Sequence, residues 1–238
     1  MREIHMDKMK NGAVLRNGTQ RTAKEVFEKY AIVIAFLALL IVVSILCSSF
    51  LTPSNLILVL NQTSINGILA VGITYVLITA GIDISIGSVV GLSGVISAMV
   101  VKAGAPLPVG FLCGILAGTL VGVIIGILVT KGKLAPYIVT LGFLTIIRGA
   151  ALLIAGGRPI SSLGDAYGWI GNHNVFGVIP CPVIIFLIVV VIGHIILAHL
   201  QIGRYIYAVG GNSNAAEACG ISPNKVKMFV HVFCLSLI

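Results

Sequence analysis

Charged residues are scarce in this sequence of 238 residues. Only 9% of the residues are Asp, Glu, Lys or Arg, whereas 58% are hydrophobic. A globular domain has about 25% charged residues, because polar side chains must cover its surface. This chain has too few of them to cover a core of its size, but a lipid bilayer accepts apolar surface directly. The composition therefore excludes an ordinary soluble domain and predicts a polytopic membrane protein.

Motifs that bind nucleotides or carry out hydrolysis are missing from the sequence. It contains no GxxxxGK[ST], HExxH or GxSxG pattern, and Asp83, Asp165 and Glu217 are its only acidic residues after residue 28. The five cysteines are widely spaced and form no CxxC pair, which predicts neither a disulfide framework nor a metal site. We therefore expect no cofactor and no enzymatic activity in this chain. If ATP drives its function, another chain must hold the nucleotide.

The net charge of +8 would suit a nucleic-acid-binding protein, so the positions of the basic residues are decisive. Seven of the 15 Lys and Arg residues lie in residues 1–29, and no basic patch interleaved with aromatic residues follows. The pattern therefore indicates no nucleic-acid partner, and it reports membrane topology instead.

Six apolar runs are long enough to cross about 30 Å of hydrocarbon, which takes roughly 20 helical residues. A seventh run begins at Val226 and reaches Ile238 without a basic tail. The sequence thus predicts an all-α transmembrane bundle with six complete spans and the start of a seventh. We expect a basic segment over 1–29 and a membrane domain over 30–238 that is incomplete at its C-terminus. The six runs are Tyr30–Phe50, Thr63–Ala80, Ser85–Val101, Leu107–Thr130, Tyr137–Ala155 and Ile179–His199.

Lys and Arg are distributed unequally between alternate loops. If the N-terminus is cytoplasmic, the inside segments hold twelve of them, whereas the outside segments hold only Lys102 and Arg158. Positive residues are in excess on the cytoplasmic side of a membrane. We therefore expect the N-terminus and the loop over 200–227 to be cytoplasmic.

Five glycines recur at intervals of four residues in the fourth run, so they lie on one helix face. Such a face lets a neighbouring backbone approach closely, which is how helices associate in lipid. We expect it to pack against another helix, and a substrate path along it is the alternative. The five residues are Gly110, Gly114, Gly118, Gly122 and Gly126.

The junction between the second and third runs places glycine, hydroxyl and acidic residues in an otherwise apolar stretch. It includes Gly81, Asp83, Ser85 and Gly87. On one interpretation it is a tight cytoplasmic turn in which Asp83 is the N-cap of the third helix. On the other it is a broken helix whose freed backbone groups line a cavity, so that Asp83 and Ser85 border the translocation pathway. The sequence leaves both interpretations open.

Further polar residues lie within the apolar runs. Arg148 lies 11 residues beyond Tyr137, which is about 16 Å along a helix. A charge at that depth must face protein or water, so Arg148 either borders the pathway or bonds carbonyl groups of a neighbouring helix. Asp83 has the right charge to be its partner, but not the expected depth. Asn61 and Gln62 open the second run from outside, where they either meet a polyol or form a solvated helix entrance.

The cytoplasmic segment 200–225 contains signals for a short internal helix. Asn214 and Glu217 have capping-box spacing, and Gly220 supplies a C-terminal stop. Ser222-Pro223 then starts the next helix as its N-cap and first residue. A short capped helix between two spans suits a groove on a partner protein better than a small molecule, and an ordinary connecting loop is the alternative.

Several motifs, in order along the chain, resemble the membrane permease subunits of bacterial ribose-type ABC sugar importers. The resemblance extends from about Tyr30 to the C-terminus. One departure is that the family usually has Gly-Gly where this chain has Ala80-Gly81. The motifs are Asn61–Gly72, Thr79–Ser88, Thr140–Gly149 and Gly203–Asn212, followed by Ala215-Ala216 and Gly220-Ile221.

The resemblance implies an all-helical subunit of about ten spans that dimerises in the bacterial plasma (inner) membrane. It implies that the subunit receives a monosaccharide such as ribose from an external sugar-binding protein and docks a cytoplasmic ATP-binding subunit. This chain stops where the family continues for several helices. A secondary sugar transporter and a non-transporting scaffold remain alternatives. The implied ATPase-coupling residues are Gly210, Gly211, Asn212, Ala215, Ala216, Glu217 and Gly220.

Overall fold

The computed structural model describes residues 28–161, 163–164, 167–168, 171, 174–175 and 179–237. Nearly all of the basic segment over 1–29 lies outside the described residues. The chain divides into two compact units, Met1–Leu56 and Ile57–Ile238.

Five helices in the described part of the chain are long and apolar enough to cross a membrane. A sixth, α3 (Ile86–Lys102), is also apolar but shorter, with 17 residues. These six helices correspond to the six predicted runs, which confirms the all-α polytopic class. The five long helices are Glu28–Leu46, α2 (Pro53–Ile78), α4 (Leu107–Thr130), α5 (Pro136–Ile154) and α7 (Cys181–Ala198).

Shorter elements follow the fifth span. The strands β1 (Asn174–Val175) and β2 (Ile179–Pro180) form a two-stranded antiparallel ladder before α7. After α7, the helices α8 (Gln201–Gly211) and α9 (Ser213–Ala218) occupy the predicted cytoplasmic segment. The last helix, α10 (Pro223–Ser236), lies where the seventh run begins.

Proline residues explain why several of these helices begin where they do. Proline lacks a backbone N–H, but the first turn of a helix does not need one, so proline is tolerated there. The first turns of α4, α5, α7 and α10 contain Pro108, Pro136, Pro182 and Pro223.

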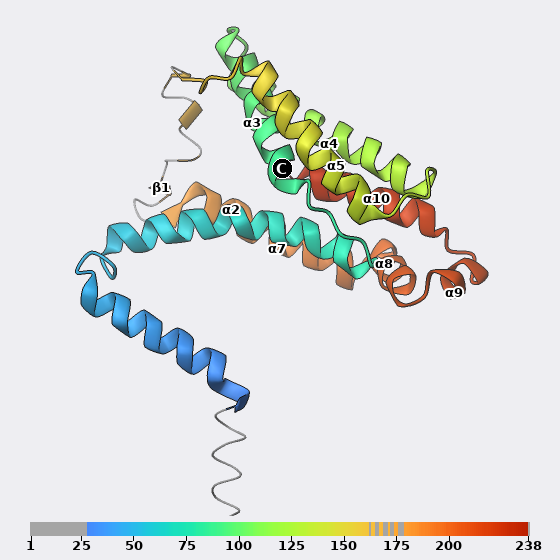
Figure 1. Ribbon diagram of the computed structural model, residues 1–238, viewed down its shortest axis with the longest axis horizontal. Helices are drawn as coiled ribbons and strands as arrows, with labels where there is room; N and C mark the ends of the chain where they lie inside the picture. Colours follow the sequence, from blue (N-terminus) through green and yellow to red (C-terminus); the bar gives the residue numbers. More distant parts are fainter. Residues whose placement is uncertain are drawn as a thin grey trace, which may run out of the picture. The chain divides into compact units, whose positions relative to one another are not determined.

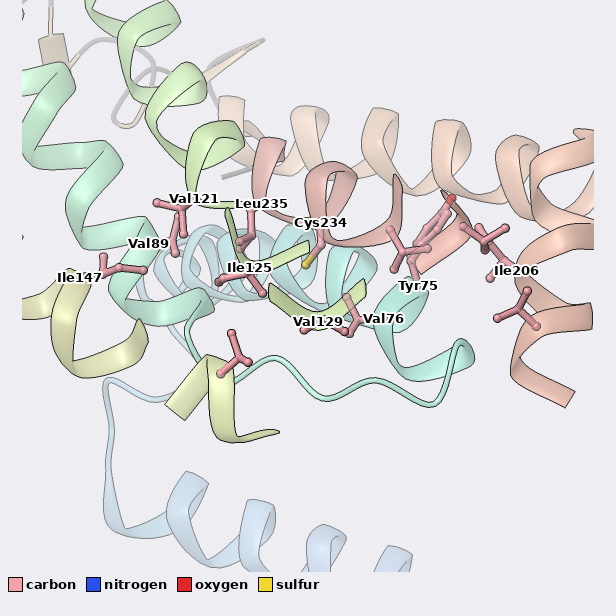
Figure 2. Packing of buried hydrophobic residues seen from close by; sticks show 14 of the residues in the cluster. Tyr75, Val76, Val89, Val121, Ile125, Val129, Ile147, Ile206, Cys234 and Leu235 are labelled. Atoms are coloured by element: carbon pink, nitrogen blue, oxygen red, sulfur yellow. The ribbon is translucent and has the colours of Figure 1, made fainter. Parts of the chain in front are cut away.

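In the second unit, α4 packs against α3 and α10, and α3 also packs against α5 (Figure 1). A buried hydrophobic cluster continues from these helices to α2 and α8. It includes Tyr75 of α2, Ile206 of α8 and Cys234 of α10 (Figure 2). The Tyr75 hydroxyl donates a 2.7 Å hydrogen bond to the Gly193 carbonyl oxygen, which connects α2 to α7. This bond satisfies the polar end of an otherwise buried ring.

Candidate functional site

The glycine face of α4 is buried between two neighbouring helices. A Cβ atom at Gly114 would lie 3.0 Å from the Ser93 carbonyl oxygen of α3. A Cβ atom at Gly122 would lie 2.9 Å from the His231 carbonyl oxygen of α10. Both distances are shorter than ordinary van der Waals contact, so glycine permits the observed backbone approach. All five glycines of this face are buried.

The polar residues of the second run lie within a helix, not at its start. Helix α2 begins at Pro53 rather than near Thr63, so the expected helix entrance at Asn61 and Gln62 is wrong. The helix accommodates these residues because the Asn61 amide has a partner in a distant segment and Gln62 remains exposed. Asn61 Nδ2 donates to the Gly171 carbonyl oxygen at 3.2 Å, and Gln62 is exposed.

The chain leaves the helical conformation between Thr79 and Ser85. The Ala80 N–H donates to the Leu77 carbonyl oxygen and the Gly81 N–H to the Val76 carbonyl oxygen, each at 3.0 Å. Ala80 has a φ of +57°. Two such bonds around a left-handed residue form the usual end of a helix, but glycine is preferred at that position. The alanine therefore holds a strained backbone conformation at the end of α2.

Asp83 is buried in this junction, with 3% of its surface exposed. Its Oδ1 atom accepts hydrogen bonds from the Ser85 backbone N–H at 2.9 Å and from the Ser85 hydroxyl at 2.6 Å. Ser85, not Asp83, is the N-cap residue of α3. The interpretation of Asp83 as the cap is therefore wrong, because its carboxylate bonds the residue that precedes the helix.

We expect Asp83→Ala to destabilise the protein and Asp83→Asn to preserve its fold. Alanine leaves the Ser85 N–H and hydroxyl without their acceptor, and a buried unsatisfied group costs about 1–3 kcal/mol. Asparagine retains an oxygen that can accept both bonds. Thermal unfolding in detergent measures the difference. Equal unfolding temperatures for the two variants would show that these bonds do not hold the junction.

A cavity of about 810 Å³ lies between α3, α5 and the segment after α5. Arg148 of α5 and Ser88 of α3 line it, together with Arg158 and Tyr167. The Ser88 hydroxyl donates to the Leu144 carbonyl oxygen at 2.8 Å, which ties α3 to α5. Cavities of this size bind small molecules in other proteins.

Small residues form the α3 wall of this cavity. A Cβ atom at Gly87, Gly91 or Gly94 would meet no atom within 4 Å. This wall was not among the features predicted from the sequence. The spacing of the three glycines, which places them on one side of a helix, is the signal that could have found it.

The five residues predicted to border the pathway do not form one cluster. Arg148 lines the cavity, whereas Asp83 and Ser85 lie in the buried junction and do not line it. Asn61 and Gln62 lie on α2 and are not among the residues that line the cavity. Among the described residues, no ion pair joins Asp83 to Arg148, and the second carboxylate oxygen of Asp83 has no hydrogen-bond partner.

The predicted coupling segment contains two helices and a single linking residue. Gly210 and Gly211 are the last residues of α8 and do not form a flexible flank. Asn212 links α8 to α9, and its Oδ1 atom accepts hydrogen bonds from the N–H groups of Asn214 and Ala215, each at 3.0 Å. Asn212 is therefore the N-cap of α9.

The expected capping box between Asn214 and Glu217 is wrong, because Asn212 caps the helix and Asn214 lies inside it. Gly220 ends this region with a φ of +82°, as the predicted stop requires. Ser222 is the N-cap position of α10, although its side chain forms no capping bond. Ala216 is buried, whereas Asn214, Ala215, Glu217 and Ala218 of α9 are exposed and can face a partner.

Residues 55–234 match the family model described as "Branched-chain amino acid transport system / permease component". No solved structure matches the chain.

Curated relatives match over most of the chain. The ribose import permease protein RbsC of Bacillus subtilis is 41% identical over 87% of this chain and 64% of its own length. The protein of the same name from Escherichia coli K12 is 38% identical over 84% of this chain and 64% of its own length. That from Haemophilus influenzae is 42% identical over 83% of this chain and 62% of its own length. The chain thus spans somewhat less than two thirds of these relatives, and it belongs to the family of membrane permease components that the model describes.

Proposed function

We propose that the chain is the permease subunit of an ATP-driven importer and forms the transmembrane pathway for a monosaccharide such as ribose. The observation that carries this proposal is the identity of 38–42% to proteins named ribose import permeases over more than four fifths of the chain. ATP hydrolysis takes place on a separate ATP-binding partner, and this chain has a transport role without catalysis.

The cavity between α3 and α5 supports passage of a sugar. Arg148 presents a guanidinium group with five N–H donors, and sugar hydroxyl groups are good acceptors. Beside it, Ser88 retains acceptor capacity, because its hydroxyl proton is directed to the Leu144 carbonyl oxygen. The glycine positions on the α3 wall leave room for a sugar ring. Asp83 and Ser85 act on the pathway by holding the start of α3, the helix that carries this wall.

Asn61 and Gln62 of α2 complete the proposed polar pathway. The exposed Gln62 amide can both donate to and accept from sugar hydroxyl groups. The Asn61 Oδ1 atom is buried without a hydrogen-bond partner among the described residues, so its capacity to accept a hydrogen bond from a hydroxyl group is unused.

The proposed partners are an ATP-binding subunit in the cytoplasm, a sugar-binding protein outside the inner membrane and a second copy of the permease. The α9 region meets the ATP-binding subunit through its exposed residues, while Ala216 anchors it to the fold. This places the N-terminus and segment 200–225 in the cytoplasm, in agreement with the excess of Lys and Arg there. Labelling of Ser213→Cys by an impermeant thiol reagent from outside would contradict this orientation.

Uptake of radiolabelled ribose tests the proposed function. Cells that lack their own ribose importer receive this chain together with the ATP-binding subunit and the sugar-binding protein of a ribose importer. We expect uptake that stops when ATP is depleted and persists when an ionophore removes the ion gradients. Uptake that follows the ion gradient would indicate a secondary transporter. A membrane-inserted complex without sugar flux would indicate a scaffold.

A further inference from the structure

We propose that Gly210 is a positioning residue that transmits movement of α9 to the junction between α2 and α3. The proposal rests on the proposed function, and it names the contact through which an ATP-binding partner acts on the membrane helices. Gly210 lies in the last turn of α8, two residues before Asn212, which links α8 to α9.

The backbone of Gly210 lies directly against the end of α2. A Cβ atom at this position would overlap the Ile78 carbonyl oxygen, and it would lie 3.6 Å from Cγ2 of the same residue. Ile78 is the last residue of α2. By contrast, a Cβ atom at the neighbouring Gly211 would meet no atom within 4 Å. The close approach therefore requires glycine at one of these two positions and not at the other.

Helices α8 and α9 are joined by a rigid connection. The Asn212 N–H donates to the Ala208 carbonyl oxygen at 3.1 Å, so this residue ends α8 while its side chain caps α9. The Ser213 hydroxyl adds a 3.0 Å bond to the Val209 carbonyl oxygen. One residue thus belongs to the end of one helix and the start of the next. A displacement of α9 must therefore rotate or shift α8 with it.

Helix α8 also shares a buried hydrophobic cluster with α2. Ile206 and Val209 of α8 are buried in the same cluster as Tyr75 and Val76 of α2 (Figure 2). Closely packed interfaces switch between discrete arrangements and do not deform continuously. Contact at Gly210 therefore passes the motion to Ile78 at the end of α2.

The segment 79–85, which joins α2 to α3, is the part of this region that can change conformation. Beyond Ile78, the strained Ala80 is followed by residues 81–84, which have no helical conformation. Asp83 and Ser85 then fix the start of α3. A displacement of the end of α2 can change the conformation of this short segment without breaking a helix. The segment leads into α3, which carries one wall of the cavity. The proposed path therefore runs from α9 through Gly210 to the cavity.

The test compares Gly210→Ala with Gly142→Ala, a helical glycine of α5 that does not line the cavity. Both add one methyl group to a helix, but only the first meets the α2 backbone, whereas a Cβ atom at Gly142 would meet no atom within 4 Å. In vesicles with the ATP-binding subunit, we expect Gly210→Ala to lower ribose transported per ATP hydrolysed by about fivefold or more, the lower end of typical coupling between sites. Gly142→Ala should match the unmodified chain. A purely structural defect would reduce transport and hydrolysis together and leave their ratio unchanged.

Labelling of a cysteine at position 82 gives a second readout that needs no partner. Ile82 is exposed in the junction, so Ile82→Cys in a cysteine-free background should react with a thiol reagent. We expect Gly210→Ala to change its labelling rate and Gly142→Ala to leave it unchanged. Equal rates in both variants, or an unchanged transport ratio, would overturn the role of Gly210. If the unmodified chain did not associate with the ATPase or showed no ATP-driven uptake, the proposed function would be contradicted instead. The labelling result would still show whether the contact between Gly210 and Ile78 affects the junction.

Discussion

Replacing Arg148 with alanine should lower ribose uptake by roughly ten- to a hundredfold, since a hydrogen bond to a charged group contributes about 1.5–3 kcal/mol. Arg148 is the charged residue that α5 contributes to the cavity, and no described residue forms an ion pair with it. Its donors are therefore free to bind the sugar. Removal of the side chain should leave the fold intact, because the side chain is exposed and bonds no neighbouring helix.

Two control variants separate recognition from charge. Arg148→Lys keeps the positive charge but loses the planar set of donors, so we expect an intermediate loss of uptake. Lys102→Ala removes an exposed charge from the end of α3 that does not line the cavity, and it should transport normally. Uptake by Arg148→Ala equal to that by Lys102→Ala, at equal expression, would contradict the pathway assignment of Arg148.

Replacing Gly122 with valine should destabilise the membrane domain by about 3 kcal/mol, at the upper end of the usual effect of overpacking. The new Cβ would lie 2.9 Å from the His231 carbonyl oxygen and 3.0 Å from the Val232 Cα. Both atoms belong to the backbone of α10, so no side-chain rotation can relieve the collision. We expect α4 and α10 to separate and the unfolding temperature in detergent to fall.

Gly142→Val is the matched control, because a Cβ at Gly142 of α5 would meet no atom within 4 Å. Both substitutions replace a helical glycine with the same β-branched residue in an apolar helix. The control should therefore unfold close to the unmodified chain. Similar unfolding temperatures for the two variants would show that the glycine face of α4 is not the contact with α10.

Hydrophobic run length predicted the helical architecture well, because a membrane span needs a nearly continuous apolar sequence. The interval of four residues between Gly110 and Gly126 predicted one helix face, although it could not identify α3 and α10 as the neighbours. Neighbours depend on tertiary packing, which a local repeat does not encode. The weakest predictions concerned boundaries at polar residues. Asn61 and Gln62 looked like a helix start, but Ser64 bonds the Leu60 carbonyl oxygen inside the helix.

Two of the capping predictions, those for Asn214 and Asp83, failed for a related reason. Asn212 and Asn214 are both suitable cap residues, and only the end of α8 at Gly211 decides that Asn212 is used. At the other junction, one of the two interpretations made Asp83 the cap, because an acidic residue before a helix often has that role. Its burial and its bonds to Ser85 depend on the fold of residues 79–85. The contact between Gly210 and Ile78 joins distant segments, and no sequence pattern indicates it.

ATP-driven ribose accumulation in purified vesicles tests the central claim most directly. Vesicles would contain this chain and its ATP-binding subunit, with binding protein and radiolabelled ribose on one side and ATP with the subunit on the other. We predict accumulation against a ribose gradient that requires ATP hydrolysis and disappears when this chain is omitted. Association of all components with ATP hydrolysis but without ribose movement would contradict the assignment of this chain as the sugar permease.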